Sequence, residues 1–406
     1  MSEPVTALDL ISSTAEPPAR SRTALLKRLT DVVCLPASRI NTFERAMTAD
    51  LLVEMLPEAG QEARARIARR LATLSDLPST LTRLLLRDDI ETARHLLLEC
   101  ANLSDADLVD CIASGTPEHL RLAAMRRGIS ELVVEAIIAT GDLQATETVL
   151  RNDMAKISAP AAEVILGCTR EHPRLVPLLL RRPELRPSHA FVMFWWSAPD
   201  ERRIILQRFA VTREVLQEVV SDVFPLAAAE HWQDAVSRKG LQFIERRQRN
   251  RAALDRSAFN SLDEAVAAAA EGITRESAEE LAYLSGIKPT TGAKIFTDPG
   301  GEAIAVLCKA TGLPRAAVRA LWRGLRRPEA DENGIINPSL ERAFIVFDMM
   351  AVDRAQTVLR YWNWSLTSAL TPTLMRAIRD GDQDAVDEYS APQRTAMLAL
   401  AADFGR

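Results

Sequence analysis

Histidine and carboxylate side chains are the groups in this sequence that could bind a metal ion or carry out acid–base chemistry. The histidines are His95, His119, His172, His189 and His231. They lie in separate segments and form no H-x-x-x-H or H-E-x-x-H motif, so metal ligands would have to converge from distant parts of the chain. The G-x-S-x-G, G-x-G-x-x-G and kinase motifs are missing as well. We therefore predict that the protein is not an enzyme and has no catalytic residue, no metal site and no cofactor.

Basic side chains follow a glycine turn in "IAVLCKATGLPRAAVRALWRGLRR", residues 304–327. Apolar residues at helical spacing on both sides of Gly312 predict two short helices, the pattern of a helix-turn-helix. The residues that would contact DNA phosphates are Lys309, Arg315, Arg319, Arg323, Arg326 and Arg327. The alternative is an ordinary pair of packed helices, because any two short helices joined at a glycine produce this pattern.

The segment "TDPGGEAIAV" places Asp298 and two glycines just before an expected helix, where free N–H groups could bind an anion. The segment lacks the Lys and Ser/Thr of a phosphate-binding loop, and no strand precedes it. We expect a capped turn at the start of a helix instead.

A basic stretch between residues 238 and 251 could bind an acidic partner or nucleic acid. Its cations are Arg238, Lys239, Arg246, Arg247, Arg249 and Arg251. Acidic residues, Glu245 and Asp255, lie within or close to the stretch. A solvated helix face is therefore the expected structure.

The run "FVMFWW", residues 191–196, is apolar on every side of a helix. Such a helix is either buried among others or contacts a partner, since Trp, Phe and Met are enriched in interface cores. Trp195 and Trp196 are therefore candidate partner-binding residues, and burial between a repeat region and a C-terminal module is the alternative. The "YWNW" at 361–364 allows the same two interpretations.

Similar segments recur along the first half of the chain, as "LSDADLVDCIASG" (103–115) and "ISELVVEAIIATG" (129–141) show. The first residues of the copies are Leu74, Leu103, Ile129, Ile157 and Leu185, spaced 26 to 29 residues apart. Ser75, Ser104, Ser130 and Ser158 follow the first four directly, and Ser188 lies three residues after the fifth. An apolar residue followed by Ser is typical of a capped helix start, so each copy predicts a new helix.

Other residues in these copies support helix boundaries. Ser104 and Asp107 have the spacing of a capping box, and Gly115 and Gly141 lie where two of the helices should end. A second helical segment, such as "TPEHLRLAAMRR", separates one copy from the next. Helices this short are marginally stable alone, so each pair must bury its apolar side on the next pair. We therefore predict an all-α fold: a short HEAT-like α-solenoid with a period of about 28 residues, followed by a smaller C-terminal helical module.

Composition is consistent with a cytoplasmic protein. Hydrophobic residues make up 47% of the chain, the net charge is −5, and no apolar run reaches the length of a membrane helix. Five scattered cysteines without a C-x-x-C pair suit a reducing compartment. We expect a disordered N-terminal tail without a secretory signal (1–21), a repeat domain (22–225), a charged helical connector (226–259) and a C-terminal helical module (260–406).

The repeats resemble an uncharacterised alphaproteobacterial family, domain of unknown function 2336, and the stretch from "RIARRLATLSDLPST" to "ATETVLRND" carries most of the resemblance. Later segments, "KIFTDPGGEAIAVLCKATGLPRAAVRALW" and "RAQTVLRYW", resemble it too, so that the similarity spans roughly residues 22–365. The resemblance implies a helical fold and supplies no catalytic residues.

A solenoid offers a long surface for a partner segment, so we predict a non-enzymatic interaction scaffold or adaptor with a regulatory role. Asp105, Asp107, Glu131 and Glu135 should make the outward strip of the capped helices acidic, which favours a partner segment rich in Lys or Arg. We expect no membrane or nucleic-acid partner and leave self-association open. The alternative is a DNA-binding regulator that uses residues 304–327.

Overall fold

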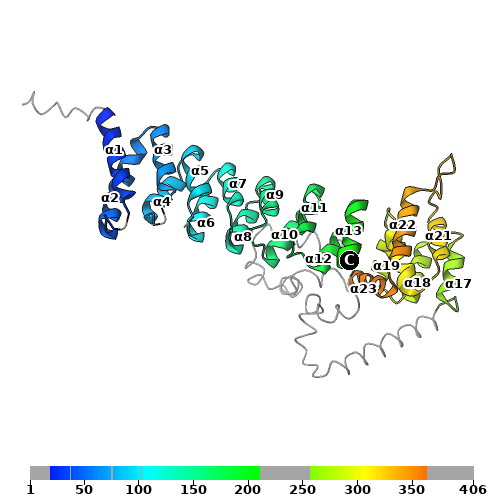
Figure 1. Ribbon diagram of the computed structural model, residues 1–406. Helices are drawn as coiled ribbons and strands as arrows, with labels where there is room; N and C mark the ends of the chain where they lie inside the picture. Colours follow the sequence, from blue (N-terminus) through cyan, green and yellow to red (C-terminus); the bar gives the residue numbers. More distant parts are fainter. Residues whose placement is uncertain (1–18, 37, 75, 102, 211–256, 364–406) are drawn as a thin grey trace, which may run out of the picture. The chain divides into compact units, whose positions relative to one another are not determined.

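The computed structural model describes residues 19–36, 38–74, 76–101, 103–210 and 257–363 (Figure 1). Over these residues the fold is all-α, as predicted, and the β-structure is a single isolated bridge between Ala330 and Ile336. The chain divides into two compact units, with the boundary between Ser158 and Ala159. None of the described helices is both long enough and apolar enough to cross a membrane.

Unit 1, which ends at Ser158, is a stack of short helices. They are α1 (Ala19–Val33), α2 (Thr42–Met55), η1 (Leu56–Glu58), α3 (Gln61–Leu71), α4 (Ser79–Leu86), α5 (Ile90–Glu99), α6 (Asp105–Ser114), α7 (Pro117–Met125), α8 (Glu131–Ala139) and α9 (Leu143–Arg151). From α1 to α9, each α-helix packs on the one two places further along the chain, which produces two rows (Figure 1). We call α1, α3, α5, α7 and α9 the odd row, and α2, α4, α6 and α8 the even row. This is the stacking predicted for an α-solenoid.

Each helix of unit 1 buries one apolar side between the two rows. In α8 that side consists of Val133, Val134, Ile137 and Ile138, all 5% exposed or less. The spacing i, i+1, i+4, i+5 places these side chains on one side of a helix, and the remaining residues face outward. Because helices of eight to fifteen residues are marginal alone, this shared core holds the stack together.

The predicted helix starts agree with the structure where the capping chemistry is local. Ser104 and Ser130 are the N-caps of α6 and α8, and their side chains accept hydrogen bonds from the backbone N–H groups of Asp107 and Val133. Ser158 directly precedes α10, the first helix of unit 2. Gly141 follows α8 with φ +75°, a backbone conformation that glycine adopts without strain.

The first and last copies of the repeat start their helices differently. Ser75 lies outside the described residues, and α4 begins only at Ser79 with Pro78 as its N-cap. The proline disfavours helical backbone at the residue before it, which delays the helix start. In the fifth copy α12 begins at Pro187, so Ser188 lies inside the helix and does not cap it.

Unit 2 contains two groups of helices. They are α10 (Ala159–Thr169), η2 (Pro173–Leu175), α11 (Val176–Arg181), α12 (Pro187–Met193), α13 (Pro199–Phe209), α17 (Leu262–Ala269), α18 (Arg275–Leu284), α19 (Pro289–Thr297), α20 (Glu302–Thr311), α21 (Arg315–Gly324), α22 (Pro338–Met349) and α23 (Val352–Asn363). Helix α20 is the centre of the second group, because α19, α21, α22 and α23 all pack on it. Helix α12 packs on α23 and so joins the two groups.

The predicted domain limits stay predictions. The tail 1–21 falls largely, and the connector 226–259 mostly, on residues outside the described ranges, and so does the boundary at 225. The cations of the basic stretch 238–251 lie outside the described residues too. The predicted loop after residue 326 does separate α21 from α22.

Candidate functional site

The outward side of the even row is strongly acidic. Its acidic residues that are not buried are Glu44, Asp50, Glu54, Asp105, Asp110, Glu131 and Glu135. Within the four described helices, Arg83 is the only cation that is not buried, and Arg87, just after α4, lies 3.7 Å from Asp110. We call this surface the acidic face.

The odd row has the opposite balance. Its cations that are not buried are Arg22, Lys27, Arg28, Arg64, Arg66, Arg69, Arg70, Arg94, Arg121 and Arg151. Its acidic residues are fewer: Asp31, Glu62, Glu91, Glu99, Glu118 and Glu147. Several form ion pairs with cations of their own row, such as Asp31 with Arg70 and Glu147 with Arg151. Acidic residues therefore predominate on one side of unit 1 and basic residues on the other, although helices of the two rows alternate along the chain.

Asp105 and Glu131 lie on the acidic face, and their role in binding a partner stays a prediction. Both are exposed and occupy the first turn of their helices, α6 and α8. Neither forms an ion pair with a described residue, so their charges are available to a partner. Glu135 is half-buried and accepts a hydrogen bond from the hydroxyl of Ser158.

Asp107 does not belong to the acidic face, contrary to the prediction. Its side chain is buried, and its Oδ2 accepts a hydrogen bond from the Ser104 hydroxyl at 2.6 Å. Its Oδ1 accepts another from Arg83 Nε at 3.1 Å, which ties α6 to α4. The capping geometry turns this carboxylate back toward the neighbouring helix and away from solvent.

Trp195 and Trp196 pack inside unit 2. The centres of the Trp195 and Trp362 rings are 4.9 Å apart, and Phe194 contacts both of these rings. The Trp196 indole N–H donates to Oγ1 of Thr169 at 3.0 Å. Both tryptophans are half-buried, and Phe191, Phe194, Trp195, Tyr361 and Trp362 form one intramolecular aromatic cluster. Trp364 lies outside the described residues.

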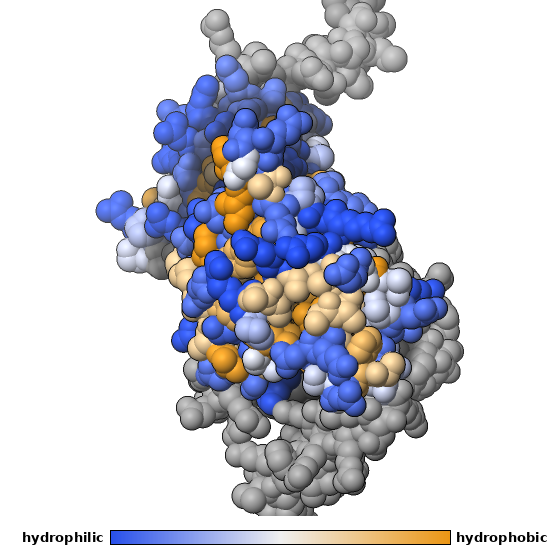
Figure 2. Space-filling model, turned by 90° about the vertical axis from the view of Figure 1, so that its right-hand side faces the viewer, coloured by the Kyte–Doolittle hydropathy of each residue, from blue (hydrophilic) through white to orange (hydrophobic). Residues whose placement is uncertain are grey.

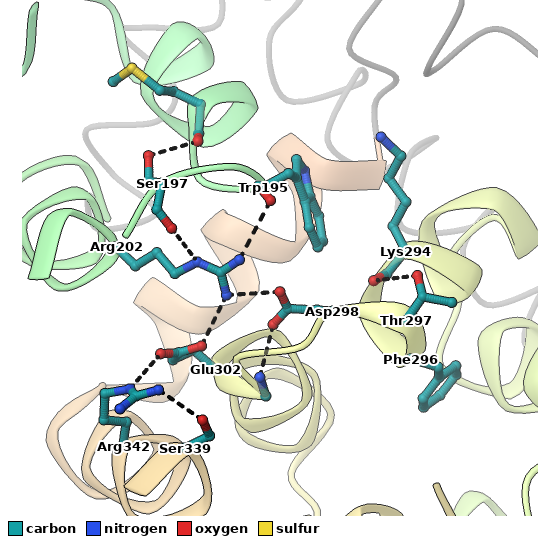
Figure 3. Close-up of polar contacts among 12 residues, drawn as sticks. Trp195, Ser197, Arg202, Lys294, Phe296, Thr297, Asp298, Glu302, Ser339 and Arg342 are labelled. Atoms are coloured by element: carbon teal, nitrogen blue, oxygen red, sulfur yellow. Dashed lines mark hydrogen bonds and ion pairs between the residues drawn. The ribbon is translucent and has the colours of Figure 1, made fainter. Parts of the chain in front are cut away.

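A buried ion-pair network was not predicted from the sequence (Figure 3). Arg202 Nη1 on α13 lies 2.8 Å from Asp298 Oδ1 and 3.0 Å from Glu302 Oε2. Arg202 Nε also donates to the Ser197 carbonyl oxygen, and Arg342 contacts the other oxygen of Glu302. Arg202, Asp298 and Glu302 are all buried, so this cluster connects α13 to α20 and α22 and is not open to a ligand.

The segment before α20 is a capped turn, as predicted. Asp298 Oδ2 accepts a hydrogen bond from the Gly301 N–H at 3.0 Å. Gly301 has φ +83°, and a Cβ there would collide with the ring of Trp322. A Cβ on Gly300 would meet Glu302 and Arg202. The two glycines therefore let the turn approach the buried ion pairs and the tryptophan closely.

The helix-turn-helix candidate is α20, a turn at Gly312, and α21. Arg315, Arg319 and Arg323 share one exposed face of α21, but each contacts an acid of unit 2. Arg315 Nε lies 3.2 Å from Asp348, and Arg319 and Arg323 both contact Glu329. Lys309 Nζ lies 4.5 Å from the centre of the Phe347 ring. These four of the predicted cations therefore already have intramolecular partners.

The surface at the C-terminal helices carries dispersed apolar residues. Ile345 and Met349 are exposed on α22, and Tyr283 is exposed on α18. Figure 2 shows orange and pale-orange residues on this side of the molecule, interrupted by blue hydrophilic ones. This pattern does not single out one binding surface.

Two of the histidines that the structure describes are buried and contact neighbouring polar groups. His119 is buried, with Nδ1 2.8 Å from the Thr116 hydroxyl and Nε2 3.1 Å from the Asp88 carbonyl oxygen. His189 is buried beside Arg186 and Glu163. Within the described part of the chain no group of three or more His, Cys, Asp or Glu side chains is arranged to hold a metal ion, and His231 lies outside it.

Comparison with known proteins adds a family. No curated protein and no solved structure matches the chain. The family described as an uncharacterised protein conserved in bacteria (DUF2336) matches residues 92–360, from α5 to α23. The match covers well over half of the sequence, including the α6–α8 part of the acidic face and the buried network around Arg202. The chain therefore belongs to the DUF2336 family of conserved bacterial proteins.

Proposed function

We propose that this protein is a non-enzymatic, cytoplasmic interaction scaffold whose acidic face binds a basic segment of a partner protein. The observation that carries the proposal is the sorting of charge between the rows of unit 1. Carboxylates project from α2, α6 and α8 with Arg83 as the one exposed cation of the even-row helices, while arginines project from the odd row.

The sorting has a physical consequence for recognition. A single exposed ion pair contributes about 1 kcal/mol or less, so one carboxylate would select nothing. A row of like charges fixed on packed helices produces a field that attracts a segment of opposite sign and orients it. Asp105 and Glu131 belong to successive even-row helices, so an extended basic segment that crosses α6 and α8 meets both.

The test is a titration of the full chain with a fluorescent peptide in which lysines alternate with glycine and serine. The variant Asp105→Lys/Glu131→Lys reverses two charges of the acidic face. The matched control, Glu62→Lys/Glu118→Lys, makes the same charge change in the first turns of α3 and α7, on the odd row. We expect the first variant to weaken binding at least about tenfold, or about 1.4 kcal/mol, and the control to change it less than about twofold. Equal effects of the two variants, or no binding by the wild-type protein, would refute the proposal.

DNA binding through residues 304–327 is the second candidate, because Arg315, Arg319 and Arg323 share an exposed face of α21. Phosphates would have to displace Asp348 and Glu329 from these arginines. The measurement is retention on duplex DNA at increasing salt by the wild-type protein and by Arg315→Glu/Arg319→Glu. A DNA-binding role requires retention at low salt that the variant loses, with a flatter salt dependence. Absence of retention by the wild-type protein rules this function out.

A further inference from the structure

Helix α2 exposes three large apolar side chains along one side. Phe43 is 71% exposed, Met47 55% and Leu51 49%. They are four residues apart, so successive side chains rotate only about 40° around the helix, and together they span about 12 Å along it. We call these three residues the apolar stripe. Among the described helices of unit 1, no other exposes three such residues at this spacing.

The apolar stripe is on the outward side of the even row. The opposite side of α2 is buried, with Ala49 and Leu52 both fully covered. Acidic residues border the stripe: Glu44 on one side, and Asp50 and Glu54 on the other. The apolar stripe is therefore part of the acidic face, and its side chains do not belong to the buried core.

The helix that carries the stripe is firmly held. Asn41 and Glu44 form a capping box at its start. Arg45 is buried, donates to the Leu35 carbonyl oxygen at 2.6 Å, and forms an ion pair with Asp76 at 3.2 Å. A binding surface on such a helix is preorganised, so little conformational entropy is lost when a partner binds.

We infer that α2 is the anchor point for an amphipathic helix of a partner protein. Apolar side chains of that helix at i, i+4 and i+7 pack on the apolar stripe, and lysines or arginines on its flanks face Glu44, Asp50 and Glu54. Amphipathic helices that bind a protein surface through their apolar side use this spacing of anchors. The sign of the partner's charge rests on the proposed function, whereas the apolar stripe is an independent observation.

Charge complementarity favours this occupant over a second copy of the chain and over residues 1–18. A two-fold symmetric contact would place the apolar stripe of one copy on the apolar stripe of the other. The acidic residues Glu44, Asp50 and Glu54 of the two copies would then lie close together and repel one another. Residues 1–18, which precede α1, contain Glu3, Asp9 and Glu16 and no Lys or Arg. A partner with a basic amphipathic helix satisfies both the apolar stripe and its acidic border.

The probe is an 18-residue fluorescent peptide with leucines on one helical face and lysines on the other. A peptide of the same composition in scrambled order, which cannot form an apolar face, is the peptide control. The protein variant is Phe43→Gln/Met47→Gln. Met125→Gln is the control for the substitution at Met47. Met125 lies on α7 in the odd row, and its exposed fraction (57%) is nearly that of Met47 (55%). Circular dichroism verifies that all variants keep their helix content.

We expect Phe43→Gln/Met47→Gln to weaken binding of the amphipathic peptide about five- to tenfold, while Met125→Gln changes it less than twofold. The scrambled peptide should bind all forms equally. An equal loss with Met125→Gln, or no loss in the stripe variant, overturns the inference. So does a wild-type dimer, seen by sedimentation, that the stripe variant converts to a monomer, because the occupant would then be a second copy.

The lysine–glycine–serine peptide separates this inference from the proposed function. It has no apolar residues, so its binding should respond to Asp105→Lys/Glu131→Lys and not to Phe43→Gln/Met47→Gln. If that peptide fails to bind while the amphipathic peptide still depends on Phe43 and Met47, the proposed function fails and the anchor stands. If only the charge-reversal variant affects both peptides, the anchor fails and the acidic face stands.

Discussion

Nε of Arg83 on α4 lies 3.1 Å from Oδ1 of Asp107 on α6, and this contact divides the acidic residues of α6 into two kinds. Asp107 is buried and serves the stacking of the even row. Asp105, two residues earlier, is exposed and contacts no described cation. Two aspartates in the first turn of α6 therefore differ in role: Asp107 holds α6 on α4, and Asp105 belongs to the acidic face.

Asp107→Asn should destabilise the protein by about 1–3 kcal/mol, because the buried carboxylate loses its charge toward Arg83 and an acceptor for the Ser104 hydroxyl. Asp105→Asn, its exposed neighbour, should change stability by less than about 0.5 kcal/mol. Urea unfolding followed by circular dichroism measures both. Equal effects of the two substitutions would show that Asp107 is not a structural residue.

Arg202→Met should be among the most destabilising substitutions in unit 2. It leaves the buried carboxylates of Asp298 and Glu302 close together without their shared cation, which costs about 3–5 kcal/mol. Arg203→Met is the matched control, since Arg203 is exposed and pairs only with exposed Asp200. Thermal unfolding should show a large decrease in melting temperature for Arg202→Met alone. Adding Asp298→Asn and Glu302→Gln should restore part of the loss, and no restoration would argue against this cause.

Gly301→Ala and Gly312→Ala separate backbone strain from steric collision. Both glycines have φ +83°, so either substitution should cost about 1–2 kcal/mol through the left-handed backbone. A Cβ at Gly312 meets nothing within 4 Å, whereas one at Gly301 collides with Trp322. Gly301→Ala should therefore be the more destabilising of the two in a denaturant titration. The same loss at both positions would mean that the turn can move away from Trp322.

Alkaline pH should weaken unit 1 through Cys111. Burial raises the pKa of this thiol to about 11, above its ordinary value of 9.0. Because the raised pKa belongs to the folded state, the stabilising effect is complete below pH 9 and is lost as the pH rises from about 9 to about 11. Between pH 8 and pH 10 the thiol should account for about 1 kcal/mol of lost stability. Urea unfolding at both pH values should show a smaller decrease for Cys111→Ala than for the wild-type protein, and an identical decrease would contradict this.

Local features of this fold were predictable from the sequence. Ser104 and Ser130 cap helices through hydrogen bonds three residues away, and the apolar spacing of α6 and α8 defines their buried sides. The helix predicted to start at Leu74 begins only at Ser79, because Pro78 disfavours helical backbone at the residue before it. The glycine turn before α20 was also predicted correctly, since Asp298 and Gly301 are three residues apart.

The contacts between distant residues could not be predicted in this way. Arg83 and Asp107 are 24 residues apart, and Arg202 and Glu302 are 100 apart, so neither pair has a sequence pattern. The acidic face was partly predicted, from Asp105, Glu131 and Glu135. Its contribution from α2 was missed, although comparing the charges of alternate helices would have found it.

Carbodiimide coupling tests the central claim most directly. The reagent forms an amide bond between a lysine and a carboxylate only where the two side chains are in contact. The lysine–glycine–serine peptide is coupled to the wild-type protein, and the joined residues are identified by mass spectrometry. The account predicts coupling to the acidic face, at Asp105 and Glu131 above all, and little at Glu62 and Glu118 of the odd row. Coupling spread evenly over both rows, or concentrated on the odd row, would contradict it.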